Sequence, residues 1–197
     1  MSGFIFSKLS ESNLRLLNTG GVGILPTDTI YGIVTQVKNP ESVKRLYALK
    51  SRENKPGTII ASNVQQIIDL GIKQKYIDMA QSFWPNPISI ILPADESLSY
   101  LHHGLNSLAF RVVSNSQIAK LLDITGPLLT TSANEPGQPV ANTVSEAREY
   151  FGDLVDFYID GGNLSDATAS AVILISNDEV MVLRSSPVVQ EILRSQK

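Results

Sequence analysis

Three short polar segments hold the residues whose types and spacing could do chemistry. The first is Pro26-Thr27-Asp28-Thr29-Ile30-Tyr31-Gly32, which directly follows an apolar stretch. Polar residues at the end of a strand lie where open α/β sheets usually bind ligands. The Thr hydroxyls could hold a small polar ligand that Tyr31 covers. The same residues are also typical of a turn that only links a strand to a helix, and both interpretations stay open.

The second segment concentrates positive charge, because Lys50, Arg52 and Lys55 lie within six residues. An arginine offers a planar fork of donors and a lysine a compact charge, and both suit phosphate or carboxylate oxygens. Cations at the end of a helix also stabilise its macrodipole, so a purely structural role is the alternative.

The third segment is Thr130-Thr131-Ser132-Ala133-Asn134, which follows an apolar stretch. Its hydroxyls and amide suit recognition of a sugar, a phosphate or a carboxylate, although a capped turn has the same composition. Two arginines add to these segments. Arg111 lies inside an apolar run and Arg184 ends another, so each must face solvent, an anion or a wet cleft.

Several classes of enzyme are excluded by missing motifs. The chain has no GxxxxGK[ST] loop, no GxGxxG turn, no GxSxG elbow and no cysteine. His102 and His103 are adjacent in a loop-like stretch, without the spacing of a helical zinc site. What remains is the binding of polyanions without a covalent nucleophile, in which cations position phosphates and Mg²⁺ usually takes part.

The elements that must position these residues alternate along the chain. Helices are predicted over residues 8–18, 40–49, 63–70, 73–83, 115–122, 144–151 and 188–194. Strands are predicted over residues 22–25, 58–61, 88–92, 108–113, 127–131, 155–159, 171–175 and 180–184. This alternation predicts an α/β protein with helices packed on a mixed, twisted sheet. We find no linker or repeat and predict a single domain over residues 1–197.

Composition supports a globular protein of the cytosol. The chain has 197 residues, of which 43% are hydrophobic and 18% are charged. The net charge of -3 and the pI of about 5.4 give no general attraction to nucleic acid. No apolar stretch approaches the length of about 20 residues that spans a bilayer, and no signal peptide is evident, so we expect no membrane association and a cytoplasmic location.

These segments, in this order, resemble the YrdC-like family, whose members include threonylcarbamoyl-AMP synthases. The first segment resembles the opening motif of that family, Lys50-Ser51-Arg52 its KxR element and Ser132-Ala133-Asn134 its SxN element. The resemblance implies a twisted mixed β-sheet flanked by helices around a concave cationic cavity, in the short form without a further domain. Further matches follow in the expected order, namely Phe83-Trp84-Pro85-Asn86-Pro87, Ala109-Phe110-Arg111-Val112, Gly161-Gly162, Ser170 and Arg184.

The resemblance also implies a reaction, in which ATP, L-threonine and bicarbonate form threonylcarbamoyl-AMP and pyrophosphate on the way to N6-threonylcarbamoyladenosine in tRNA. Mg²⁺ would accompany ATP. A downstream threonylcarbamoyl transferase complex and a weak contact with tRNA are the implied partners. Lys50 and Arg52 are then the expected catalytic residues. The expected threonine and bicarbonate contacts are Thr29, Tyr31, Lys50, Arg111 and Ser170, and the expected ATP contacts are Arg52, Lys55, Ser107, Ser132, Asn134, Val140 and Arg184.

The chain departs from the family pattern at three positions. Glu53 stands where a Pro is common, Ala61 where a His is common, and Ala171 where a Thr is common. Two other hypotheses therefore stay open, a YciO-type paralogue and a non-catalytic module that binds double-stranded RNA or tRNA by shape. The acidic pI disfavours the RNA-binding module.

Overall fold

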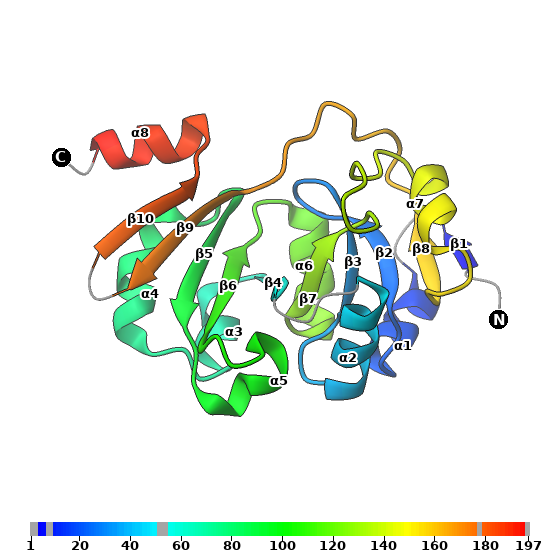
Figure 1. Cartoon of the computed structure of the whole chain (residues 1–197), viewed down its shortest axis with the longest axis horizontal. Helices are drawn as coiled ribbons and strands as arrows, with labels where there is room; N and C mark the ends of the chain where they lie inside the picture. The colour runs from blue at the N-terminus through cyan, green and yellow to red at the C-terminus, as the bar shows by residue number, and fades with distance from the viewer. Residues whose placement is uncertain (1–3, 7–9, 51–54, 177–178, 196–197) are drawn as a thin grey trace.

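The sheet runs through the whole molecule (Figure 1). A computed structural model describes residues 4–6, 10–50, 55–176 and 179–195. Among these residues, ten strands form one mixed, twisted sheet in the order β1-β8-β2-β3-β7-β4-β6-β5-β9-β10. The predicted α/β class is confirmed. The strands are β1 (Phe4–Phe6), β2 (Gly23–Pro26), β3 (Tyr31–Gln36), β4 (Thr58–Ala61), β5 (Ile88–Pro93), β6 (Ser107–Val112), β7 (Leu128–Ser132), β8 (Phe157–Ile159), β9 (Ala171–Ser176) and β10 (Glu179–Arg184).

Several helices begin directly after a capping side chain. Asn39 accepts a hydrogen bond from the N–H of Ser42, and Asn115 accepts from Gln117 and Ile118, as expected for Asn at an N-cap. Within the described ranges, no helix has the length and apolar character needed to cross a membrane. The helices are α1 (Glu11–Asn18), α2 (Pro40–Leu49), α3 (Val64–Ile68), α4 (Gln74–Ala80), α5 (Ser99–His102), α6 (Ser116–Thr125), α7 (Val144–Phe151) and α8 (Pro187–Ser195), with 3-10 turns η1 (Gln81–Phe83) and η2 (Glu96–Leu98).

Strand β3 corrects the sequence prediction of a long loop after the first buried strand. Pro26 still belongs to β2, and Tyr31 and Gly32 already belong to β3, which pairs antiparallel with β2. Only residues 27–30 form the connecting turn. β3 is buried on both faces over most of its length, so its sequence lacks the alternation of apolar and polar residues that marks a half-buried strand.

Two smaller features also differ from what the sequence predicted. The strand β1 was not predicted, although it pairs in parallel with β8 at one edge of the sheet. His102 was placed in a loop, but it ends helix α5 and is fully buried. Its Nδ1 accepts hydrogen bonds from the backbone N–H groups of Gly104 and Asn106, so the ring has a structural role in closing this turn.

The pairing register decides which side chains share a face of the sheet, because directly opposed residues point the same way. Val34 pairs with Thr130, Thr130 with Thr58, and Ile60 with both Leu128 and Arg111. The apolar members of this face pack against α1 and α6 in one core cluster. The polar members continue the same face beyond that cluster, so they form a polar surface beside the two helices.

The close contact between β2 and β8 leaves no room for a larger side chain at Gly23. A Cβ at Gly23 would come within 2.2 Å of the Phe157 ring. Gly23→Ala should therefore lower the free energy of unfolding by about 1–3 kcal/mol, measured by urea denaturation, because overpacking forces both strands to shift. Phe157→Leu makes room for the added methyl group, so the double variant should lose less than the sum of the single losses. Strictly additive losses would contradict this steric explanation.

Candidate functional site

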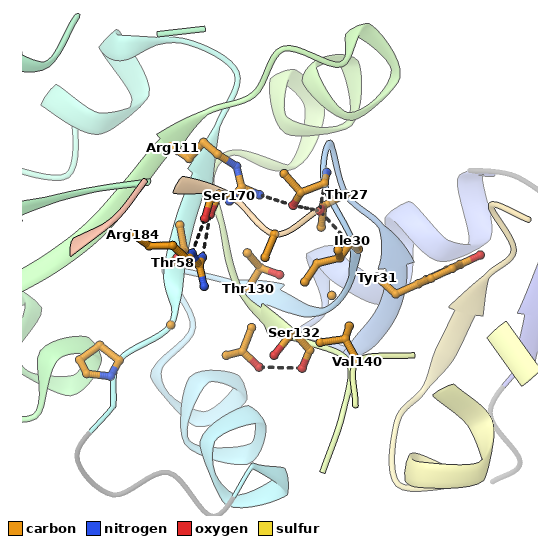
Figure 2. A pocket seen from close by; sticks show the side chains of 16 residues that line it. Thr27, Ile30, Tyr31, Thr58, Arg111, Thr130, Ser132, Val140, Ser170 and Arg184 are labelled. Carbon is orange, nitrogen blue, oxygen red and sulfur yellow. Dashed lines mark hydrogen bonds between the residues drawn. The ribbon is translucent and has the colours of Figure 1, made fainter. Parts of the chain in front are cut away.

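A cavity of about 250 Å³ opens beside the polar part of this sheet face (Figure 2). Strands β3, β4, β6 and β7 form its wall, together with the turn of residues 27–30 and the residues that precede β9. Segments that are far apart in the sequence therefore meet at one site. The described lining residues are Thr27, Thr29, Ile30, Tyr31, Gly32, Pro56, Gly57, Thr58, Arg111, Thr130, Thr131, Ser132, Val140, Ala169, Ser170 and Arg184.

Hydroxyl groups dominate this lining, which holds neither a carboxylate nor a histidine among the described residues. The Oγ1 of Thr130 is buried without a hydrogen-bond partner in the described structure. A Cβ at Gly32 would come within 2.4 Å of that oxygen, so the glycine leaves room for the Thr130 hydroxyl. Thr130 belongs to the third candidate segment, whereas Thr58 was not singled out from the sequence.

Arg111 lies on β6 with only 4% of its side chain exposed, and its charge is compensated by Asp28. Its Nε and Nη2 both donate to Oδ1 of Asp28, at 3.1 and 2.8 Å. The Asp28 side chain is fully buried and its Oδ2 has no hydrogen-bond partner in the described structure. A buried arginine of this kind needs such a partner because dehydration of an isolated charge is costly. Asp28 lies inside the first motif, but its pairing with Arg111 was not predicted.

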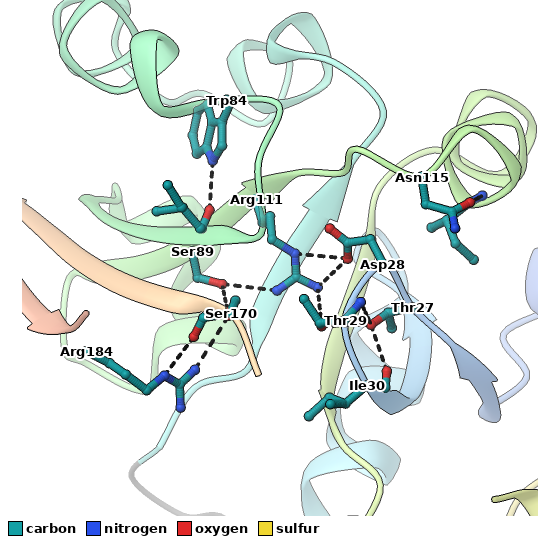
Figure 3. A network of polar contacts seen from close by, with 12 residues as sticks. Thr27, Asp28, Thr29, Ile30, Trp84, Ser89, Arg111, Asn115, Ser170 and Arg184 are labelled. Atoms are coloured by element: carbon teal, nitrogen blue, oxygen red, sulfur yellow. Dashed lines mark hydrogen bonds and ion pairs between the residues drawn. The ribbon is translucent and has the colours of Figure 1, made fainter. Parts of the chain in front are cut away.

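A chain of polar contacts links Arg111 to Arg184 (Figure 3). Arg111 Nη1 donates to Ser89 Oγ at 3.1 Å, and Ser89 Oγ lies 2.9 Å from Ser170 Oγ. Arg184 Nε in turn donates to the carbonyl of Ser170 at 2.7 Å. The structure therefore brings Arg111 and Ser170, which were expected to contact threonine, together with Arg184, which was expected to contact ATP. Ser89 was not predicted, because a single Ser in an apolar strand gives no local signal.

Lys50 is not among the lining residues, but it contacts the SxN turn, whose Ser132 lines the cavity. Its side chain is buried, and its Nζ donates to the carbonyl of Ser132 at 2.9 Å and to Oδ1 of Asn134 at 3.0 Å, as well as to the Asn134 carbonyl. Ser132 Oγ donates to the same Asn134 Oδ1 at 2.7 Å. The loop then returns, since Ala141 bonds to Ala133, and this places Val140 beside Ser132 on the cavity wall. The KxR lysine and the SxN turn thus form one cluster.

Three other residues, which were expected to contact ATP, are not among the described lining residues. Arg52 lies outside the described residues. Lys55 is exposed and directly precedes Pro56 and Gly57, which line the cavity. Ser107 opens β6, is half-buried and pairs with Pro93, so it does not belong to the described lining. Contacts of Arg52, Lys55 and Ser107 with a ligand stay predictions.

Tyr31 borders the cavity, but its hydroxyl is used within the protein. It accepts a hydrogen bond from the N–H of Gly161 at 2.8 Å and donates to the carbonyl of Gly162 at 2.9 Å. These bonds fasten the segment of residues 160–170, which crosses one end of the sheet to β9 (Figure 1). Burial raises the pKa of the Tyr31 hydroxyl above its ordinary value of 10.0, although the Gly161 N–H acts in the opposite direction. The hydroxyl therefore acts as a latch within the protein, and a contact of Tyr31 with a ligand stays a prediction.

The arrangement suits a ligand with acidic and hydroxyl groups. Arg111 and Arg184 both line the cavity and are linked through Ser89 and Ser170. Hydroxyls supply most of the other polar groups of the lining, and Lys50 adds a positive charge that contacts the SxN turn. In the part of the chain that is described, no group of three or more acidic or His side chains is placed to hold a metal ion. The fold and the site together define a mixed α/β protein with a polar cavity that is suited to anionic ligands.

Comparisons with known proteins agree with this class. The family model Sua5_yciO_yrdC, described as "Telomere recombination", matches residues 15–186. The threonylcarbamoyl-AMP synthase of Pseudomonas aeruginosa is 34% identical over 161 residues, which cover 80% of this chain and 87% of the relative. The chain belongs to the Sua5/YciO/YrdC family.

Two solved structures share the fold. Sua5 of P. abyssi, crystallised with L-threonine, aligns with a TM-score of 0.78 and 26% identity. The alignment covers 92% of this chain but only 56% of that one, so the chain spans little more than half of Sua5. YciO of E. coli aligns with a TM-score of 0.77 and 20% identity, over 92% of this chain and 93% of that one, and shows the fold alone.

The Tyr31 latch can be tested directly. Tyr31→Phe leaves the N–H of Gly161 and the carbonyl of Gly162 without their partner, so we expect a loss of about 1–3 kcal/mol in the free energy of unfolding at pH 8. Amide hydrogen exchange at Gly161 and Gly162 should accelerate. Because the folded-state pKa of this hydroxyl is raised, its contribution is fully present below about pH 10 and falls only as pH rises through that higher value. Identical unfolding curves and exchange rates at pH 8 would contradict the latch.

Proposed function

We propose that this protein is an L-threonylcarbamoyladenylate synthase, a nucleotidyltransferase that forms threonylcarbamoyl-AMP and pyrophosphate from L-threonine, bicarbonate and ATP. One observation carries the proposal. Residues expected to contact threonine (Thr29, Arg111, Ser170) and residues expected to contact ATP (Ser132, Arg184) line one cavity. A reaction that joins two bound substrates requires both subsites side by side. The named synthase relatives support the same conclusion.

The proposed chemistry depends on placing anions close together. The threonyl carbamate carries an oxygen that must approach the α-phosphorus of ATP, and both groups are negative. Arg111 would bind the amino-acid carboxylate, while Arg184 and the hydroxyl of Ser132 would bind the nucleotide. Lys50 and Arg52 would offset the charge that develops as pyrophosphate leaves. No covalent intermediate on the protein is required, which fits a lining of hydroxyls and cations.

Mg²⁺ would enter as part of the substrate. The described lining offers no carboxylate, which is the ligand that Mg²⁺ usually takes from a protein. These residues do not fit a resident magnesium site, so we assign the ion to the triphosphate of ATP and derive no step through it.

The product would pass to a threonylcarbamoyl transferase complex that modifies tRNA. Direct contact with tRNA would be weak for a chain with a net charge of -3. The YciO-type alternative shares the fold, and it differs from the proposal in the reaction and not in the architecture. An activity measurement therefore separates the two.

The proposed function is tested by pyrophosphate release from ATP and Mg²⁺, with L-threonine and bicarbonate added separately and together. We expect release only when both are present, because neither substrate alone can supply the attacking carbamate. Release without threonine, or no release from a folded protein that binds ATP, would contradict the proposal and favour the YciO-type or RNA-binding alternatives.

Lys50→Met should lower the rate of this release by about 100-fold or more, because it removes a positive charge beside the SxN turn while keeping the chain length. Lys73→Met is the matched control. Lys73 forms an exposed pair with Asp95, with 62% and 63% of the side chains accessible, and should keep activity within about twofold. Circular dichroism should show both variants folded. Equal rates for the two variants would remove Lys50 from the active site.

A further inference from the structure

Arg111 has five N–H donors, and the structure uses most of them on its flanks. One flank faces Asp28, whose Oδ1 accepts from Nε and Nη2. The other flank faces Ser89, whose Oγ accepts from Nη1 at 3.1 Å. One N–H then remains on each terminal nitrogen, and beyond Asp28 the other acceptor recorded for Nη2 is Thr29 Oγ1, at a long 3.5 Å. These two donors form the fork with which an arginine binds a carboxylate bidentately.

We propose that Ser89 is a positioning residue that aims this fork into the cavity. Ser89 lies on β5 and is buried, with 1% of its surface exposed, so it does not contact a ligand itself. Its hydroxyl is shared between Arg111 and Ser170, the two residues expected to hold the amino acid. This assignment rests on the proposed function, and it names a residue that fixes the threonine subsite of that function.

The position of Ser89 explains why its hydroxyl has two partners. Ser89 pairs with Val172 of β9, and its neighbours on β5, Ile88 and Ile90, belong to the apolar core on the opposite face. A hydroxyl buried in such a strand must be hydrogen-bonded, because dehydration without a partner costs free energy. Ser89 satisfies this requirement with Arg111 on one side and Ser170 on the other (Figure 3). The buried Ser89 hydroxyl therefore sets the distance between Arg111 and Ser170.

Ser89 is also linked to Arg184, because both residues contact Ser170. Arg184 Nε donates to the Ser170 carbonyl at 2.7 Å, and Nη2 lies 3.5 Å from Ser170 Oγ. Removing the Ser89 hydroxyl leaves the Nη1 donor of Arg111 and the Ser170 hydroxyl with one partner fewer. The backbone contact of Arg184 does not depend on that hydroxyl. Loss of Ser89 should therefore disturb the amino-acid subsite more than the nucleotide subsite.

The experiment compares the binding of L-threonine and of ATP, each measured by calorimetry on the full chain. Ser89→Ala should weaken threonine binding about tenfold, the effect of losing a hydrogen bond to a charged group, and change ATP binding less than about twofold. Ser89→Thr keeps the hydroxyl and should restore threonine binding. In steady-state assays the same split should appear as a raised KM for threonine with an unchanged KM for ATP.

Thr35→Val is the matched structural control, because Thr35 is fully buried and its hydroxyl donates to the Gly21 carbonyl far from Arg111. It should lower the melting temperature as Ser89→Ala does, without changing threonine binding. A double variant, Ser89→Ala with Ser170→Ala, should weaken threonine binding by less than the product of the single effects, because the two hydroxyls act as a unit.

The outcomes separate this inference from the proposed function. Unchanged threonine binding in Ser89→Ala would overturn the role of Ser89, and so would an equal loss in Thr35→Val. Failure of the wild-type chain to bind threonine would overturn it as well. If threonine binds and depends on Ser89 but no pyrophosphate is released, the positioning role stands and the proposed reaction fails.

Discussion

The buried ion pair between Arg111 and Asp28 is the interaction on which the site depends. Arg111 belongs to β6 and Asp28 to the turn between β2 and β3, and β7 and β4 lie between β3 and β6 in the sheet. Removing one partner of a fully buried pair typically costs about 3–5 kcal/mol, because the other charge is left without compensation. The pair therefore fixes the turn against the opposite wall of the cavity. It also compensates the charge of the buried Arg111, so the guanidinium can stay inside the protein instead of turning toward solvent.

The register of the sheet turns this local pair into a site. Thr58, Thr130 and Arg111 share a face because their strands pair in register, and the same face carries the apolar residues that α1 and α6 cover. The boundary between core and cavity thus falls within single strands, where an apolar residue gives way to a hydroxyl or a charge two positions along. Ile60 and Thr58 on β4 show this change directly. A shift of the pairing register of β6 by one residue would turn Arg111 to the opposite face, into the apolar core. The hydrophobic pattern that fixes the register therefore also specifies the site.

The sequence predicted most elements and singled out several residues that line the cavity, but it could not predict how these residues contact one another. The Asn39-Pro40 pair is a local signal for a helix start, and the helix predicted from residue 40 begins there. β3 was missed because a strand buried on both faces loses its alternating pattern. The partners of Arg111 were missed because Asp28 is 83 residues away in the chain, and pairing over that distance leaves no local trace. Lys50 was predicted as a cation of the site, yet its contact with the SxN turn depends on the packing of α2 against β3, which pairs with β7.

The distribution of charge explains how an acidic chain can hold acidic ligands. The net charge of -3 describes the whole surface, whereas the described cavity lining contains two arginines and no carboxylate. The carboxylate that balances Arg111 lies behind the wall, where it orients the guanidinium without occupying the fork that a ligand would use. For the proposed reaction this arrangement matters more than added positive charge, because fixing two reactants in one geometry can supply about 7–11 kcal/mol of the barrier reduction. The precision of that geometry depends on groups such as Asp28 and Ser89, which contact the binding residues from the side away from the ligand.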